Sequence, residues 1–163
     1  VAASIDYRLT IGTNRSESRG HRNTINKGHP ECHERIERIW ERMRDEGLLE
    51  SVQVVEKFLP IDDGDLRCTH TREHVDGVAG TESKGQAEID QWAATMDSVF
   101  ATPLSYAAAL SAVACTRTMA EWIVAGKIPA ALSLVRPPGH HADAATPCGF
   151  CLFNNAAQAV EAA

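Results

Sequence analysis

The most constraining feature of the sequence is a short apolar run, residues 130–135 (AALSLV), that stops at the turn-forming residues 137–139 (PPG). A run that is apolar at nearly every position is typical of a strand buried in a parallel sheet, and proline and glycine end it. His140 and His141 follow the turn directly. Because ligands of open α/β sheets gather at the carboxyl ends of the strands, we expect these imidazoles to lie at a functional site.

The rest of the chain alternates helix and strand patterns, as a parallel sheet with crossover helices requires. Residues 60–65 and 81–85 are predicted to be turn and loop. No internal repeat or linker divides the chain, so we expect one domain or a part of one. The expected elements are a strand at residues 4–9, a helix from Pro30 to Gly47, a strand over residues 52–58, one or two short helices over residues 66–78 with a break at Gly77, and a long helix from Ser105 to Gly126.

Composition excludes several classes of function. A net charge of -6, a pI near 5.6 and the lack of a Lys/Arg-rich block argue against a direct nucleic-acid partner. Five cysteines, an odd number at irregular spacings, favour reduced thiols in the nucleus or cytoplasm over a disulfide framework. No segment approaches the roughly 18 apolar residues of a membrane span, so we expect no membrane partner.

Residues 136–142 (RPPGHHA) and 148–155 (CGFCLFNN) resemble the motifs of the zinc-dependent histone deacetylases, in the arginase/deacetylase superfamily. The wording of residues 134–142 and 153–155 is most similar to class II. Weaker likenesses occur at residues 29–35 (HPECHER), where His33 replaces the usual proline, at residues 69–75 (THTREHV) and at residues 106–110 (YAAAL). The resemblance implies an α/β chain with a partial arginase/deacetylase-type three-layer fold, a mainly parallel sheet and crossover helices.

The resemblance also implies a reaction and assigns residues to it. A Zn²⁺-activated water would hydrolyse the acetyl-lysine amide in histones or other proteins. His141 would take the proton from that water and later deliver it to the lysine nitrogen, and His140 would act beside it as an electrostatic partner. Gly149 and Phe150 would line the substrate channel, and Arg35 would lie at the foot pocket through which acetate leaves.

In the family, the zinc ligands (an Asp-x-His pair and a later Asp) and a catalytic tyrosine follow the stretch that ends this chain, and no Asp-x-His triplet follows Asn155. We therefore expect residues 1–163 to be the amino-terminal portion of a single histone deacetylase domain. It would have no metal ligand of its own and no activity alone. The implied partners are acetylated histone tails, other acetyl-lysine proteins and corepressor proteins, with a role in chromatin regulation and transcription repression in the nucleus or cytoplasm.

Several alternatives stay open at this point. The chain could be a non-catalytic regulatory or interaction fragment, or its substrate could be an acetylpolyamine. Cys148 and Cys151 form a C-x-x-C motif, which in other proteins is a redox pair or half of a zinc site. The run at residues 62–65 (DDGD) resembles a calcium loop only in charge, and we interpret it as a solvated turn. A structural zinc site would need two segments to meet, and its candidate ligands are His29, Cys32, His33, Cys68, His70 and His74.

Overall fold

The structure, a computed structural model, describes residues 8–163 and contains a three-stranded parallel sheet in the order β2-β1-β3. The strands are β1 (Thr10–Thr13), β2 (Gln53–Val55) and β3 (Ala131–Leu134). Ile11 of β1 lies opposite Val54 of β2 and Leu132 of β3. The predicted parallel sheet is confirmed. The strand expected at residues 4–9 lies largely outside the described residues.

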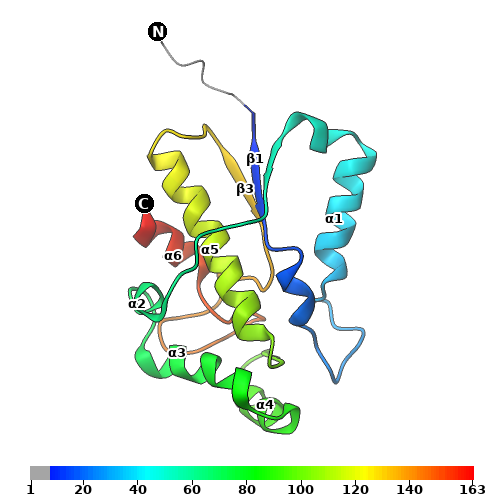
Figure 1. Cartoon of the computed structure of the whole chain (residues 1–163). Helices are drawn as coiled ribbons and strands as arrows, with labels where there is room; N and C mark the ends of the chain where they lie inside the picture. Colours follow the sequence, from blue (N-terminus) through cyan, green and yellow to red (C-terminus); the bar gives the residue numbers. More distant parts are fainter. Residues whose placement is uncertain (1–7) are drawn as a thin grey trace.

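Two helices cover opposite faces of the sheet, α1 (Glu34–Asp45) on one side and α5 (Ser105–Val124) on the other (Figure 1). Gly12 marks the contact with α5, because a Cβ at this position would lie 2.7 Å from the Sγ atom of Cys115. Side chains alternate along a strand, so Ile11 faces the other layer, and it is fully buried, as is Ile36 of α1 at 2% exposure. The three-layer α/β arrangement with crossover helices is therefore present.

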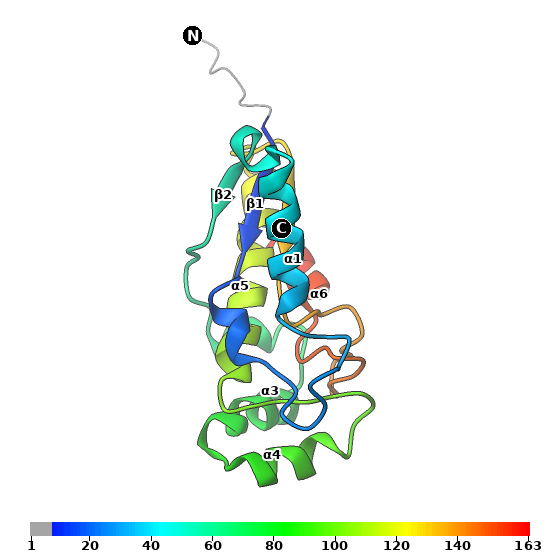
Figure 2. The same cartoon turned by 90° about the vertical axis from the view of Figure 1, so that its right-hand side faces the viewer.

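The remaining helices gather near the carboxyl ends of the strands or against α5. Helices α3 and α4 lie beyond the strand ends, at the same end as the loop that follows β3 (Figures 1 and 2). Helix α6 packs against α5. The helices not yet given are α2 (Asp63–Leu66), α3 (Arg72–Ala79), α4 (Gln86–Ala93) and α6 (Asn155–Ala162), with short 3-10 helices at Glu17–Gly20, Leu48–Ser51 and Gly80–Ser83.

One hydrophobic cluster joins the loop after β3 to the helices. Leu152 and Phe153 in that loop are buried against α5 and α3. Burying side chains of this size stabilises a fold by about 1.5–3 kcal/mol each. The loop is thus fixed by its own apolar residues. The other buried members of this cluster are Leu66, Val75, Val78, Ala109 and Val113.

The helix boundaries differ from the sequence predictions in two places. Helix α1 begins at Glu34 and not at Pro30, because Glu31 turns inward and is buried. Helix α3 runs through Gly77 without the expected break. The Thr71 side chain caps its start by accepting a hydrogen bond from the His74 amide, and a buried apolar face holds the rest of the helix in the core.

The turn predicted over residues 60–65 is in part helix α2, which begins at Asp63. The long helix predicted from Ser105 is confirmed, and the chain leaves it through Gly126 at φ 66°. The loop predicted at residues 81–85 is partly a 3-10 helix. Helices α4 and α6 were not predicted from the sequence.

Candidate active site

The turn after β3 carries His140 and His141 on the protein surface. Their rings lie 4.1 Å apart between centroids and are tilted by 47°. Both residues are exposed. Gly139 precedes them, and a Cβ there would collide with the backbone nitrogen of Asn155 at the start of α6. Only glycine fits this contact, so α6 fixes where the histidine turn lies.

A second tight turn, residues 148–151, lies directly against His141. The backbone φ angles of Gly149 and Phe150 are 53° and 71°, both in the left-handed region. A Cβ at Gly149 would lie 2.9 Å from the His141 ring, so glycine allows the turn to approach the imidazole. The His141 amide also donates a hydrogen bond to the Cys151 Sγ atom at 3.4 Å.

The segment before α5 supports this turn and completes an aromatic wall. The Gly149 amide donates a 2.9 Å hydrogen bond to the carbonyl oxygen of Asp97. The Phe150 amide donates one of the same length to the carbonyl oxygen of Ser98. The rings of Phe150 and His29 meet edge-on, with 4.8 Å between their centroids. Phe150 is half-buried. The structure therefore brings Gly149, Phe150 and His141 together.

A buried ion pair lies behind this surface, and the sequence analysis did not predict it. Arg136 is 2% exposed and forms two hydrogen bonds of 2.6 Å with both carboxylate oxygens of Glu31. Its remaining donors reach the backbone oxygens of Ser18 at 2.8 Å and His21 at 2.7 Å. A fully paired, bidentate arrangement of this kind offsets the cost of burying both charges.

His21 lies beside this ion pair in the core. Its Nδ1 atom is 2.8 Å from the Ser105 hydroxyl oxygen, and its ring stacks on Phe100 at 4.5 Å. Burial, with the nearby Arg136 charge, lowers the pKa of His21 to about 3, so the ring is neutral at physiological pH. Because the His21 ring is neutral, it adds no charge repulsion to the ion pair between Arg136 and Glu31.

The two partners of this ion pair come from separate sequence motifs. Glu31 belongs to the H-P-E run and Arg136 to the R-P-P run. An arginine at the end of a strand predicted to be buried was a signal that an acidic partner was needed. Arg35, the residue predicted for the foot pocket, is exposed on α1.

A second histidine pair, His70 and His74, is buried at the start of α3. The ring centroids are 4.4 Å apart, and both rings contact Phe153. The Nε2 atom of His70 accepts a 2.9 Å hydrogen bond from the Asn154 amide, and the Nε2 atom of His74 lies 2.6 Å from the Leu152 carbonyl oxygen. Burial lowers the pKa of both rings. This pair holds the loop that ends the active-site motif.

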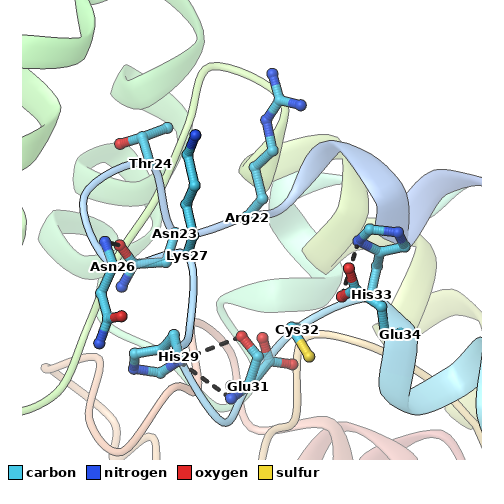
Figure 3. Close-up of a pocket in the computed structure, with 10 residues that line it drawn as sticks. All are labelled: Arg22, Asn23, Thr24, Asn26, Lys27, His29, Glu31, Cys32, His33 and Glu34. Atoms are coloured by element: carbon cyan, nitrogen blue, oxygen red, sulfur yellow. Dashed lines mark hydrogen bonds and ion pairs between the residues drawn. The ribbon is translucent and has the colours of Figure 1, made fainter.

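A pocket with a volume of about 500 Å³ lies in the loop before α1 (Figure 3). Its lining includes four cationic or imidazole side chains, Arg22, Lys27, His29 and His33. His33 pairs with Glu34 at 3.3 Å. His140 and His141 are not part of it. His29 lines the pocket and also contacts the ring of Phe150.

Within residues 8–163, no group of three His, Cys, Asp or Glu side chains is arranged to hold a metal ion. The structural zinc site considered from six His and Cys residues is therefore not assembled. The described residues do not fit the Zn²⁺ that the resemblance implies. In the same part of the chain, no helix is long and apolar enough to cross a membrane.

Gly149 and Phe150 thus lie beside the exposed His140–His141 pair, in the loop that follows the carboxyl end of β3. The histone deacetylase domain family matches residues 29–163. The chain belongs to the histone deacetylase family.

Individual relatives agree with this assignment. The chain is 43% identical to histone deacetylase 6 of Caenorhabditis elegans, covering 94% of this chain and 16% of the relative. It is 35% identical to histone deacetylase 5 of Arabidopsis thaliana, with coverages of 80% and 20%, and 30% identical to the human polyamine deacetylase HDAC10, with coverages of 78% and 20%. The chain thus spans a fifth or less of the length of these relatives.

The solved structures give the same result for the fold. The crystal structure of the HDA15 HD domain superposes with a TM-score of 0.82 at 28% identity, covering 95% of this chain and 42% of that one. The α/β fold of residues 8–163 is therefore that of part of a histone deacetylase domain.

Proposed function

We propose that this chain supplies the histidine side of the active site of a lysine deacetylase that hydrolyses acetyl-lysine amides in histone tails or other proteins. The observation that carries the proposal is the exposed His140–His141 pair, 4.1 Å between ring centroids, on a turn fixed by Gly139. Histidine exchanges protons near neutral pH, as amide hydrolysis requires of a general acid/base.

The roles of the individual residues follow from their positions. His141 would accept a proton at a ring nitrogen and return it to the departing lysine nitrogen, and His140 would support it electrostatically. Gly149 would let the substrate and the His141 ring approach the turn closely. Phe150 would pack against the lysine methylene groups as one wall of the channel.

The proposal also includes Zn²⁺, which in such enzymes activates the water and polarises the amide carbonyl. Residues 8–163 assemble no ligand set for it. Its ligands would therefore come from outside the described residues, and the roles above are those of this chain's own side chains. Arg35, exposed at the start of α1, would reach the acetate pocket only when further protein covers that surface.

An acetylpolyamine is the second candidate substrate. Two of the relatives, from rat and human, carry the name polyamine deacetylase and are 29% and 30% identical to this chain. The third candidate is a regulatory fragment that binds corepressor proteins without turnover. For a protein-directed deacetylase we propose a location in the nucleus or cytoplasm and a role in transcription repression.

The test uses a protein in which this chain is joined to the remainder of a deacetylase domain. His141→Ala should lower kcat/KM on an acetyl-lysine peptide by at least about 10²-fold, the usual loss with a general acid/base. Asn23→Ala, in a loop outside the proposed machinery, is the control. An unchanged rate in the His141 variant would refute the assignment. Comparing acetyl-lysine peptide with acetylspermidine separates the two substrate classes.

A further inference from the structure

Cys148 and Cys151 face each other across the turn that lies under His141. They form an antiparallel bridge in which the Cys148 amide donates to the Cys151 carbonyl at 3.1 Å and the Cys151 amide donates to the Cys148 carbonyl at 2.9 Å. Gly149 and Phe150 both have positive φ angles, which defines a type I′ turn between them. The side chains of residues directly opposite each other project from the same face of such a hairpin.

The Cα separation of such a pair lies within the range found for disulfides. The Cα atoms of a hydrogen-bonded antiparallel pair lie about 5.5 Å apart, and disulfides join Cα atoms separated by about 4.4–6.8 Å. Both cysteines are free thiols. Cys32, Cys68 and Cys115 have no cysteine opposite them in a bridge of this kind within the described residues.

The two thiols differ in accessibility. Cys148 is half-buried, and its Sγ atom lies 3.9 Å from the Asp97 carboxylate at the surface. Cys151 is fully buried, and its Sγ atom contacts the Gly149 carbonyl oxygen and the His141 amide, each at 3.4 Å. An oxidant therefore reaches Cys148 first, and Cys151 is placed to resolve the product.

We propose that Cys148 and Cys151 form a reversible disulfide and that this bond is a redox switch on the histidine turn, independent of the proposed deacetylase function. Hydrogen peroxide oxidises the Cys148 thiol to a sulfenic acid and is reduced to water. The Cys151 sulfur then attacks the Cys148 sulfur, the S–O bond breaks, and a second water leaves with the Cys151 proton. A dithiol reverses the reaction by thiol–disulfide exchange and is itself oxidised to a disulfide.

The bond acts on the site through two contacts. It removes the hydrogen that the Cys151 thiol donates to the Gly149 carbonyl oxygen, and it draws the Cys151 Sγ atom toward Cys148 and away from the His141 amide. Gly149 lies against the His141 ring, so a change in this turn reaches the imidazole directly. Transient bonds of this type are the usual form of disulfide in reducing compartments.

The sequence offers a direct test by peptide mapping of this chain. Trypsin should cleave after Lys127 and not at Arg136, which precedes proline, so residues 128–163 form one peptide with Cys148 and Cys151 as its two cysteines. The other three cysteines fall in separate peptides. The protein is treated with hydrogen peroxide, unfolded, alkylated and digested, and each peptide is weighed.

We expect the 128–163 peptide to lose two hydrogens, to take up no alkylating reagent, and to recover both sites after dithiothreitol. Cys151→Ser should instead let Cys148 proceed to sulfinic acid, because the resolving thiol is gone. Cys68→Ser, at an exposed cysteine, is the matched control and should leave the bridge unchanged. Two alkylated cysteines in the 128–163 peptide, or a link from either one to another peptide, would overturn the proposal.

Discussion

The two histidine pairs of this chain have nearly the same ring separation and opposite surroundings. The His140–His141 rings lie 4.1 Å apart in an exposed turn, and the His70–His74 rings lie 4.4 Å apart in the core. The buried pair is tied to backbone groups and has lowered pKa values, so it serves as neutral scaffolding. Ring proximity alone therefore does not identify a catalytic pair. The two pairs differ in exposure and in their bonding partners.

The largest expected effect is that the exposed histidine pair has no hydrolytic activity without a bound metal. Because residues 8–163 assemble no metal-ligand group and zinc supplies both the nucleophile and carbonyl polarisation, this chain alone should show no acetyl-lysine hydrolysis even with added Zn²⁺. Elemental analysis should find no tightly bound zinc. A chain that holds one zinc per molecule and turns over substrate would show that other residues build the active site.

The buried pair should affect folding more than the exposed pair does. His74→Ala removes the partner of the Leu152 carbonyl and leaves a cavity, which should lower the free energy of unfolding by about 2–4 kcal/mol. His140→Ala, the matched change in the exposed pair, should stay within about 0.5 kcal/mol. Urea unfolding of both variants measures this difference. Equal losses would mean that the two pairs are not distinguished by burial.

A smaller effect is expected at the wall of the channel. In the whole domain, Phe150→Ala should lower kcat/KM for acetyl-lysine peptides by roughly tenfold, since it removes apolar contact and no metal ligand. Zinc content should not change. Phe150 has a positive φ angle, so Phe150→Gly is a useful companion that removes the ring without backbone strain. Zinc loss in both variants would assign Phe150 a structural role.

The most gradual effect is the pH dependence of stability. The folded-state pKa values of His70 and His74 lie below the ordinary histidine value of 6.5, mainly through burial. Between the folded and unfolded pKa values, the unfolded chain therefore binds more protons than the folded chain. Stability is therefore complete above about pH 6.5 and falls as the pH drops toward the folded pKa values. Replacing both residues with Gln should flatten the unfolding free energy over this range. A profile as steep as that of the unchanged chain would locate the dependence elsewhere, with buried His21 as the next candidate.

The sequence was sufficient for features that depend on local pattern. The apolar run before the prolines predicted β3. Features that join distant segments were not predictable in this way. The Glu31–Arg136 ion pair spans 105 positions, and nothing local to either residue names its partner.

The same limit explains the errors in the helices. The start of α1 was predicted at Pro30, because proline suits a first helical turn, but Glu31 is drawn into the core by a charge far along the chain. Gly77 favours a break in isolation, and the packing of Val75 and Val78 overrides it. In both cases tertiary contacts decided between local conformations of similar free energy.

Arg136 also affects the order in which the molecule folds, because its partners lie far back along the chain. Its bonds to Ser18, His21 and Glu31 cross 118, 115 and 105 positions, so they close long loops through the site. Contacts of such separation carry a large entropic cost and form slowly. On a ribosome, the first thirty-odd residues must wait until β3 has emerged before their carbonyls and carboxylate meet a partner. The histidine turn therefore takes its final position late, because Arg136 pairs with residues made more than a hundred positions earlier.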